Sequence, residues 1–404
     1  MRLGIVYHMP FWRAADGTLR EVEGSFARYV DSLAPYFDEI SLCVPVLSEA
    51  RGEGTPIRAT NVTLAPLPNF EGPVHFYPQL LTMLPRIWRW VRTIDVLHCR
   101  IPSPAAIFAF ALARMQARPA FVLIVGDLKA LLPTMPYRGV KKLLWRGYTA
   151  FEEWAVQWMS DRSVAFANGE ALAAKHSTPR KAVIVTTTTT ISAADISSRV
   201  DIDATDTLRI LCVSRIDPRK GLRVLPDVVR LLVEQDIAVS LDIVGPAVGR
   251  PGVEEQEAIA STAARLGVGD RVHCLGPVPL EQLLPLYRGY DAFVLPTLPG
   301  EGIPRVLLES MTAGVPVVTT RVAGIPSLIK HEVNGLLVDA PTATAVADAI
   351  ARVVYDASLR RRLIANGYET ARGFTLEAQA ARILSEVSAR LPITLKQPAK
   401  VPAA

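Results

Sequence analysis

Short, nearly continuous hydrophobic runs recur along the chain, and many are followed by a stretch compatible with a helix. Runs such as AFVLIV, residues 120–125, are typical of parallel strands buried on both faces, because neither face then needs polar side chains. Two runs, RLGIVYH from Arg2 and RILCVSRI from Arg209, have the character of an opening strand. The alternation therefore predicts an α/β protein with two Rossmann-like domains, each holding a doubly wound sheet.

The segment between the two series is polar and acidic. Residues 192–207, SAADISSRVDIDATDT, contain few large apolar side chains, and we interpret them as a linker. This gives a first domain at residues 1–195 and a second at 205–375, and the tail at residues 392–404 is expected to be disordered. Open α/β sheets bind ligands beyond the carboxyl ends of their strands, so two such domains predict a central cleft with one lobe for each substrate.

The composition agrees with a globular protein of two domains. The chain has 404 residues, of which 50% are hydrophobic and 21% charged, and this length exceeds what one compact core accommodates. No stretch reaches the roughly 18 apolar residues of a membrane span, and residues 1–6 lack a signal-peptide core, so a cytoplasmic location is expected. The cysteines show no Cys-x-x-Cys spacing, which favours buried thiols over disulfides or zinc ligands (Cys43, Cys99, Cys212 and Cys274).

Positive charge is concentrated in the first half. Residues 1–200 contain 22 Lys and Arg against 16 Asp and Glu, whereas the remainder contains 22 against 23. No zinc-finger, RNP or helix-turn-helix pattern accompanies these charges, so an anionic membrane surface or a phosphate-bearing acceptor is a better candidate partner than nucleic acid. Residues 141–158 form either a core helix or an interfacial helix on anionic lipid, with apolar side chains at helical spacing and cations near the start (Leu144, Tyr148, Phe151, Ala155 and Trp158; Lys141, Lys142 and Arg146).

The stretch GEGIPRVLLESMTAGVPVVTT, residues 300–320, holds two glutamates eight positions apart. Within one helix they would point in different directions, and Pro304 suits the first helical position, so Glu301 is placed in the entering loop and Glu309 on the helix. The N–H groups of this helix start suit a phosphate, and Gly302 allows close approach. Glu301 and Glu309 would then hold hydroxyls, in the order sugar, phosphate, ribose. The alternative is an ordinary amphipathic helix with a solvated glutamate at its start.

A charged loop follows the strand RILCVS. In RIDPRKGL, Arg215 and Lys220 lead into a helix that starts near Gly221. Two fixed cations at a strand end can neutralise a diphosphate, and a loop glycine lets the backbone approach it. Charged loops are usually only solvated, but residues 300–309 also follow a strand, and the two stretches together favour a phosphate site.

These motifs resemble those of the retaining family 4 glycosyltransferases of the GT-B fold, which transfer a sugar from a nucleotide-sugar to an acceptor. The resemblance covers most of the chain and is specific in the second half, where SRIDPRKGL, DIVGPA, LGPVP, DAFVLPTLPGEGIPRVLLESMTAGVPVVTTRVAGIPSLI and NGLLV follow in the family's order. It implies that Arg215 and Lys220 grip the donor diphosphate. It also implies that Glu309 holds ribose hydroxyls and that Glu301 faces the donor sugar.

The resemblance implies further contacts in the second domain. The base is expected near Gly276 and Val278, and a last helix at residues 376–391 is expected to cross back onto the first domain. The remaining expected donor-binding residues come from DIVGPA and from the helix start (Gly245, Gly302, Ile303, Pro304, Arg305 and Val306).

The first half resembles the family more loosely. EGSFARYVDSLA replaces the family's glycine-bearing loop and helix, and DVLHCR keeps His98 but has Arg100 where a second histidine is common. AFVLIVGDL ends in Gly126-Asp127 where many members carry a histidine near the reacting centre. The expected acceptor-side residues follow from these positions (Gly24, Ser25, His98, Arg100 and Gly126). We expect Asp127 to contact a donor-sugar hydroxyl and to take part in catalysis.

The implied reaction needs no cofactor and no metal. Arg215, Lys220 and the helix start stabilise the leaving diphosphate, the acceptor hydroxyl attacks from the same face, and no side chain is assigned as a covalent nucleophile. Asp201 and Asp203 have the spacing of a metal-binding pair, but they lie in the predicted linker and are taken as solvated. Five histidines show no metal spacing and are taken as structural (His8, His75, His176, His273 and His331).

The expected substrates rest on family habit and on the basic first half. A UDP-sugar is favoured over a GDP-sugar, and the acceptor is a glycan or a lipid-linked molecule of surface polysaccharide or glycolipid biosynthesis, reached from the inner face of the membrane. Two alternatives remain open. A nucleotide-sugar epimerase of the GT-B fold would turn over the donor without an acceptor, and a catalytically silent protein would bind the donor but never transfer its sugar.

Overall fold

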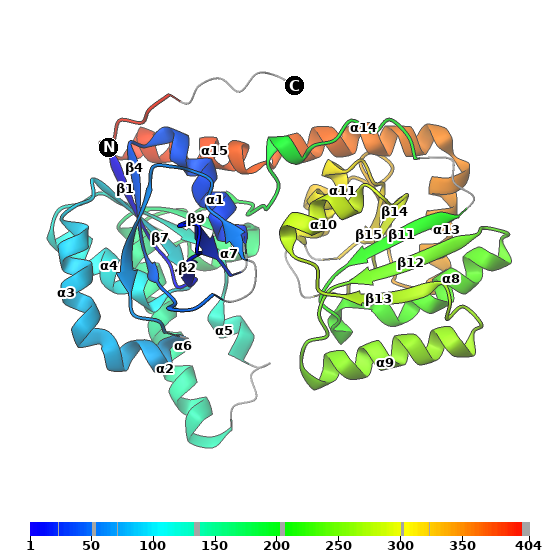
Figure 1. Cartoon of the computed structure of the whole chain (residues 1–404), viewed down its shortest axis with the longest axis horizontal. Helices are drawn as coiled ribbons and strands as arrows, with labels where there is room; N and C mark the ends of the chain where they lie inside the picture. The colour runs from blue at the N-terminus through cyan, green and yellow to red at the C-terminus, as the bar shows by residue number, and fades with distance from the viewer. Residues whose placement is uncertain are drawn as a thin grey trace. The chain divides into compact units, whose positions relative to one another are not determined.

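The chain is built on two parallel β-sheets, one in each half (Figure 1). The computed structural model describes residues 1–22, 24–50, 54–70, 72–132, 138–202, 207–299, 303–322 and 324–397. Unit 1 consists of Met1–Thr188 and the chain from Leu376 onward, and unit 2 consists of Thr189–Thr375.

Unit 1 is built on a seven-stranded sheet with the order β10-β9-β8-β7-β1-β4-β6. Its strands are β1 (Arg2–Val6), β4 (Glu39–Pro45), β6 (Val62–Leu67), β7 (Val96–Ile101), β8 (Ala120–Ile124), β9 (Val164–Asn168) and β10 (Ile184–Thr186). A small antiparallel sheet holds β2 (Phe11–Arg13), β3 (Leu19–Glu21) and β5 (Thr55–Pro56). The helices are α1 (Ser25–Leu33), α2 (Gly72–Phe76), α3 (Leu80–Val91), α4 (Pro104–Met115), α5 (Leu128–Leu131), α6 (Gly139–Asp161), α7 (Glu170–His176) and α15 (Leu376–Arg390), with 3-10 turns η1 (Ala34–Tyr36) and η2 (Tyr77–Gln79).

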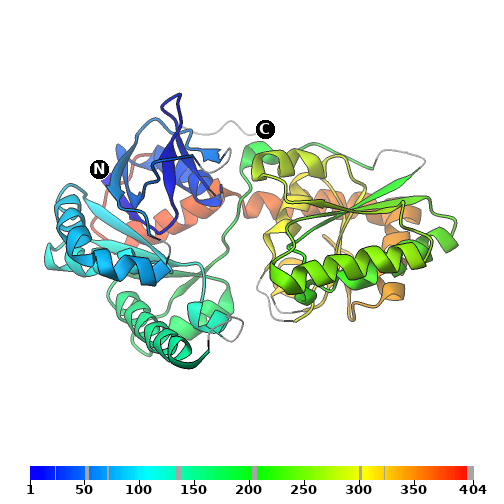
Figure 2. The same cartoon turned by 60° about the horizontal axis from the view of Figure 1, so that its bottom comes forward.

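Unit 2 is built on a six-stranded sheet with the order β13-β12-β11-β14-β15-β16. Its strands are β11 (Leu208–Val213), β12 (Val239–Val244), β13 (Val272–Gly276), β14 (Ala292–Leu295), β15 (Val317–Thr320) and β16 (Leu336–Val338). The helices are α8 (Leu225–Glu234), α9 (Gly249–Arg265), α10 (Leu280–Tyr287), α11 (Arg305–Thr312), α12 (Ile325–Leu328), α13 (Ala343–Tyr355) and α14 (Ala357–Gly373), and the 3-10 turns are η4 (Ala193–Asp195), η5 (Pro218–Lys220) and η6 (Leu222–Val224). Figure 2 shows the light green α9 on the near side of the strands.

The hydrophobic runs become strands because both faces of each sheet are covered. In β7, Leu97 and Cys99 contribute to a core that also contains residues of α3, α4 and α6, whereas Val96 contributes to a core that contains residues of α1 and α15. A strand between two apolar layers needs hydrophobic side chains at every position, which explains the continuous pattern in the sequence. The prediction of two doubly wound α/β domains is confirmed.

Each sheet has a topological switch point beside its first strand. In unit 1, β1 pairs with β4 on one side and with β7 on the other. In unit 2, β11 pairs with β12 on one side and with β14 on the other. Successive connections leave such a point in opposite directions, so the loops at the carboxyl ends of β1 and β7, and of β11 and β14, border a crevice in which open α/β sheets bind ligands.

The residues predicted as a linker are largely part of unit 2. The division lies between Thr188 and Thr189, and η4 carries a capping box between Ser192 and Asp195. Asp201, which was taken as solvated, accepts a hydrogen bond from Nε of Arg360 at 2.5 Å. These residues are polar because their side chains bind other polar groups of unit 2. In the sequence, this polar composition alone suggested a linker. Asp203 lies outside the described residues.

The expectation of a disordered tail at residues 392–404 is wrong for its first part. Ile393 and Leu395 pack against the core of unit 1 that contains α1 and α15. The N–H of Lys396 donates to the carbonyl of Tyr36 at 3.0 Å, and its Nζ pairs with Asp38 at 2.6 Å. Two apolar side chains and an ion pair are enough to hold a segment that looks polar and proline-rich in the sequence.

Candidate functional site

The loops after β11 and β14 pack closely together at the switch point of unit 2. Gly221 has φ +65°, and a Cβ atom on it would lie 2.3 Å from the carbonyl oxygen of Pro296. The N–H of Leu298 donates to the carbonyl of Arg219 at 2.9 Å. Only glycine tolerates both this positive φ and such close contact with the Pro296 carbonyl. Gly221 therefore allows the two loops to pack against each other.

The loop after β11 presents cations at this edge of the sheet. Arg215 is exposed, and Lys220 is buried at the end of η5. Arg219 is paired with Asp217 at 2.7 Å, and its hydrogen bond is the main reason why the pKa of Asp217 falls to about 2. Arg219 is engaged by Asp217, and Arg215 and Lys220 are the two cations that the sequence predicts to face a diphosphate.

Helix α11 begins beside this loop. Pro304 has extended backbone angles and is the N-cap, so the helix starts at Arg305 and not at Pro304 as the sequence suggested. No described side chain caps the helix start, and the first N–H groups of a helix have no acceptor within the helix itself. Ile303 and Val306 are partly buried against the core of unit 2. Glu301 and Gly302 lie outside the described residues.

Glu309 is held by two hydroxyl groups of its own unit. Its side chain lies on α11 and is 4% exposed. Thr190 donates to Oε1 at 2.6 Å, and the hydroxyl of Tyr287 donates to Oε2 at 3.0 Å. Burial, followed by the charge of Glu309, raises the pKa of Tyr287 well above its ordinary value, so Tyr287 stays a donor. These two bonds orient the Glu309 carboxylate on α11.

The other expected donor-binding residues lie at the carboxyl ends of β12 and β13. Gly245 follows β12 with φ +144°, and a Cβ atom there would lie 2.0 Å from the carbonyl oxygen of Ser214. Its N–H donates to the carbonyl of Gly276, the last residue of β13, at 2.9 Å. Val278 follows two residues later and packs partly against the core. The structure thus brings these residues to the same edge of the sheet as Arg215, Lys220 and the start of α11.

The expected acceptor-side residues lie at the start of α1 and on β7. Gly24 is the N-cap of α1 with φ +85°, and Ser25 is its first residue. His98 is fully buried, its Nε2 lies 3.1 Å from the Tyr29 hydroxyl, and its ring stacks on Phe121. Burial, and then the charge of Arg100, lower the pKa of His98 to about 3. The histidine is therefore neutral and surrounded by core residues.

Gly126 and Asp127 follow β8, as expected, but Asp127 already has partners. Its Oδ1 accepts from the N–H of Ala130 at 3.1 Å and so caps α5. Its Oδ2 pairs with Nζ of Lys175 at 2.6 Å, and Lys175 also pairs with Glu153 at 2.9 Å. Burial alone would raise the pKa of Asp127, but the bonds from Lys175 and Ala130 hold it below its ordinary value. The structure shows Asp127 as a helix cap and an ion-pair partner.

A small pocket beside Asp127 contains two polar residues that the sequence did not identify as a site. Glu152 is 5% exposed, and burial, then the charge of Asp127, raise its pKa to about 7. His176 is buried too, and burial lowers its pKa. Neither Oε1 of Glu152 nor Nδ1 of His176 has a hydrogen-bond partner in the part of the chain that the structure describes. The helical spacing of Glu152 with Ala155 and Met159 was the signal, since it places a carboxylate on the buried face of α6.

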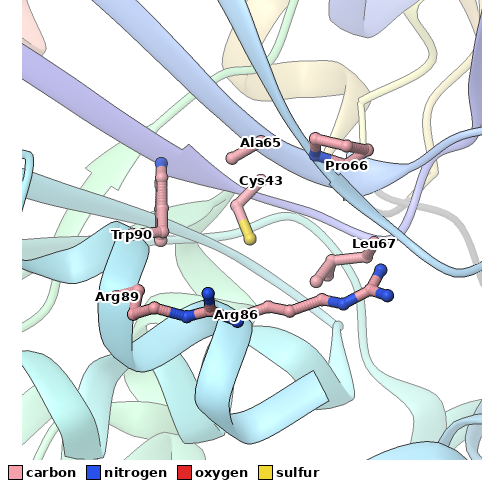
Figure 3. Close-up of a pocket in the computed structure, with 7 residues that line it drawn as sticks. All are labelled: Cys43, Ala65, Pro66, Leu67, Arg86, Arg89 and Trp90. Atoms are coloured by element: carbon pink, nitrogen blue, oxygen red, sulfur yellow. The ribbon is translucent and has the colours of Figure 1, made fainter. Parts of the chain in front are cut away.

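A second hollow lies between the edge strand β6 and helix α3 (Figure 3). Its lining is apolar except for two arginines of α3 (Cys43, Ala65, Pro66, Leu67, Arg86, Arg89 and Trp90). Figure 3 shows the Arg86 side chain extending toward Leu67. None of the residues predicted for donor or acceptor lines this hollow.

Among the described residues, no group of three or more His, Cys, Asp or Glu side chains is arranged to hold a metal ion. Within the same ranges, no helix is both long enough and apolar enough to cross a membrane.

Known proteins resemble both the sequence of unit 2 and the fold of the chain. Residues 197–370 match the family described as glycosyl transferases group 1. The D-inositol 3-phosphate glycosyltransferase of Actinosynnema mirum is 33% identical over 185 residues, which are 45% of this chain and 44% of that protein. The enzyme of the same name from Corynebacterium efficiens is 34% identical over 176 residues, or 43% of this chain and 41% of that protein. The matched part thus spans less than half the length of these relatives.

The solved structures extend the similarity of fold to nearly the whole chain. Anabaena Alr3699/HepE in complex with UDP and glucose has a TM-score of 0.65 and 17% identity, covering 97% of this chain and 100% of that one. Sucrose-phosphate synthase from Thermosynechococcus elongatus has a TM-score of 0.65 and 16% identity, covering 96% of this chain and 98% of that one. The predicted GT-B fold and the resemblance to glycosyltransferases are confirmed.

Proposed function

We propose, from the premise that residues 197–370 belong to the glycosyl transferases group 1 on a GT-B fold, that this protein is a retaining hexosyltransferase of family 4. It moves a sugar from a nucleotide-sugar to a hydroxyl of a glycan or lipid-linked acceptor. The observation that carries the proposal is the edge of the unit 2 sheet, where Arg215, Lys220 and the start of α11 lie at the switch point.

Each part of this edge suits one part of a nucleotide-sugar. The cations and the helix N–H groups suit the diphosphate, and Glu309 suits the ribose hydroxyls because it is an oriented hydrogen-bond acceptor. UDP is the favoured nucleotide, since Alr3699/HepE has been solved with UDP and with UDP-glucose. D-inositol 3-phosphate, named for the relatives, makes a phosphorylated polyol a candidate acceptor.

The chemistry follows from charge stabilisation. The bond from the sugar to the diphosphate breaks, and its growing negative charge is met by Arg215, Lys220 and the N–H groups of α11, with no metal required. The acceptor hydroxyl attacks the same face of the sugar, and its proton passes to the departing diphosphate. Arginine is well suited to this position because its fork can bind two phosphate oxygens at once.

We also propose a site at the inner face of a membrane, in surface polysaccharide or glycolipid biosynthesis. The first turns of α6 extend below the rest of unit 1 in Figure 1. Ala155, Val156 and Met159 near the end of α6 are buried, whereas five apolar side chains between positions 140 and 154 are 39–73% exposed (Val140, Leu143, Leu144, Phe151 and Trp154). Lys141, Lys142 and Arg146 flank them. An exposed apolar stripe beside three cations is the pattern of a helix that docks on anionic lipid.

A donor panel tests the proposed reaction. UDP, GDP and their glucose conjugates are compared by thermal shift, because a ligand that binds only the folded protein raises Tm by mass action. Stabilisation by the UDP series, lost in Arg215→Met, is the expected result. Donor consumption is then followed with and without acceptor. Turnover of intact donor to an epimer without acceptor identifies an epimerase, and binding without any turnover identifies a silent protein.

A further inference from the structure

Arg100 is a buried cation with no ion-pair partner among the described residues. It lies on β7 and is 4% exposed. Its Cζ atom is 4.8 Å from the ring centre of Tyr29, 5.2 Å from that of Tyr7 and 5.4 Å from that of Phe26. Its Nε and Nη1 atoms are buried and have no hydrogen-bond partner, and no carboxylate lies within 4.0 Å of it in the ranges that the structure describes.

None of the neighbouring groups that the structure describes forms an ion pair with Arg100. His8 and His98 are neutral, because burial and the nearby guanidinium lower their pKa to about 4 and about 3. Burial raises the pKa of Tyr29, so it stays protonated. Glu21 uses Oε2 to accept from the N–H groups of Phe26 and Ala27 at the start of α1. Aromatic faces attract a cation, but they offer no acceptor for the buried N–H groups.

The position of Arg100 is that of a ligand residue. It is the penultimate residue of β7, which pairs with β1 through Val6 and Cys99 at the switch point of the unit 1 sheet. Its ring contact Tyr7 follows β1, and its ring contact Phe26 is the second residue of α1. The guanidinium therefore lies at the edge where open α/β sheets bind ligands, next to a helix start.

We propose that Arg100 binds an oxyanion, a phosphate or a carboxylate, carried by the acceptor substrate. A buried charge in a folded protein is normally paired, and the planar fork of arginine binds two oxygens of such a group. The acceptor part of this inference rests on the proposed function, whereas the anion site itself does not. Unit 2 would bind the donor phosphates, and unit 1 would recognise a second anionic group.

Inorganic phosphate is the first probe. At constant ionic strength, phosphate is expected to raise the Tm of the full chain, and Arg100→Met is expected to weaken the apparent Kd for phosphate at least tenfold. Without phosphate, Arg100→Met should unfold at the same temperature as the wild type or higher, because an unpaired buried cation has been removed. Arg114→Met, at an exposed position of the same unit, is the control and should respond to phosphate like the wild type.

The anion site is refuted if phosphate leaves the wild-type Tm unchanged, or if it stabilises Arg100→Met as much as the wild type. If the methionine variant does not fold, Arg100→Lys replaces it, since lysine keeps the charge but not the fork, and a wild-type Kd in that variant also counts against the proposal. None of these measurements involves a nucleotide-sugar, so they can succeed or fail independently of the transferase proposal.

A second probe distinguishes the source of the anion. A polyol phosphate, myo-inositol phosphate, is compared with inorganic phosphate and with myo-inositol in the same assay. Tighter binding of the polyol phosphate, lost in Arg100→Met, supports an acceptor that carries the oxyanion. Equal binding of the two phosphates contradicts the acceptor assignment and leaves a site for the free ion.

Discussion

The Glu309→Gln substitution is expected to weaken nucleotide binding and to lower the free energy of unfolding. The two effects can be measured separately. The wild-type carboxylate accepts from Thr190 at 2.6 Å and from Tyr287 at 3.0 Å, and we propose that it also accepts from the ribose. A hydrogen bond to a charged group contributes about 1.5–3 kcal/mol, which corresponds to roughly a 10- to 150-fold change in Kd. Glu309→Gln should therefore weaken UDP and UDP-glucose by similar factors in that range, because both contain the ribose.

The same substitution should also lower the free energy of unfolding. The amide is uncharged and its NH₂ replaces one of two buried acceptor oxygens, so both hydroxyls lose a charged partner and one of them, of Thr190 or of Tyr287, loses its acceptor, at a cost of about 1–3 kcal/mol. Tyr287→Phe is the matched control, because it removes one buried hydroxyl and leaves the carboxylate charge in place. Its stability should fall, while its Kd for UDP should change less than that of Glu309→Gln.

Calorimetry with UDP and UDP-glucose, combined with urea unfolding, measures both effects. A Glu309→Gln variant that loses stability but binds UDP like the wild type would show that Glu309 only anchors Thr190 and Tyr287. By contrast, Glu301→Gln should leave UDP binding nearly unchanged and lower transfer, because its expected partner is the sugar. Equal weakening of bare UDP by both substitutions would refute the division into a sugar residue and a ribose residue.

Four further predictions concern metal, membrane and unit 1. Transfer should survive excess EDTA, and activity that is lost and then restored by Mg²⁺ or Mn²⁺ would refute leaving-group stabilisation by protein groups alone. The protein should sediment with anionic but not neutral liposomes at low salt and release as salt rises; Leu143→Asp should weaken this, and equal binding to both vesicle types would remove the α6 interpretation. Asp127→Asn should preserve UDP affinity and reduce turnover; a wild-type rate would leave it only as a cap of α5 and partner of Lys175. The pKa of Glu152 is raised from 4.5 to about 7, so the folded state holds its proton more tightly than the unfolded state. The free energy of unfolding should therefore fall by up to about 3 kcal/mol as pH rises from 4.5 to 7. Glu152→Gln should flatten this pH dependence in urea titrations.

The sequence was sufficient for features that depend on local pattern. The hydrophobic runs identified the strands because every strand between two helical layers needs apolar residues, and Gly221 and Glu309 were placed correctly at a loop and on a helix. The partners of Glu309 were not predictable, because Thr190 lies 119 residues away in the chain. The start of α11 was misplaced by one residue, since proline fits both the N-cap and the first turn.

In unit 1, too, contacts between residues distant in the sequence could not be predicted. Asp127 looked like a replacement for a catalytic histidine, but its pairing with Lys175, 48 residues later, depends on how α7 packs beside β9 and α6. The stretch from Lys141 to Trp158 left a core helix and a surface helix open, and both apply, because α6 is exposed in its first turns and buried in its last. Periodicity reports that a helix has an apolar face but not what covers that face.

The attachment of α15 to unit 1 has a consequence for synthesis on the ribosome. Its apolar residues complete the core around α1, yet they are translated only after all of unit 2 (Leu376, Ala380, Ile383, Leu384 and Val387). In the growing chain, unit 2 is contiguous and can close while unit 1 still exposes this hydrophobic face. A premature stop near residue 375 would therefore damage the domain that was made first, which makes the nascent unit 1 a client for chaperones until the last helix emerges.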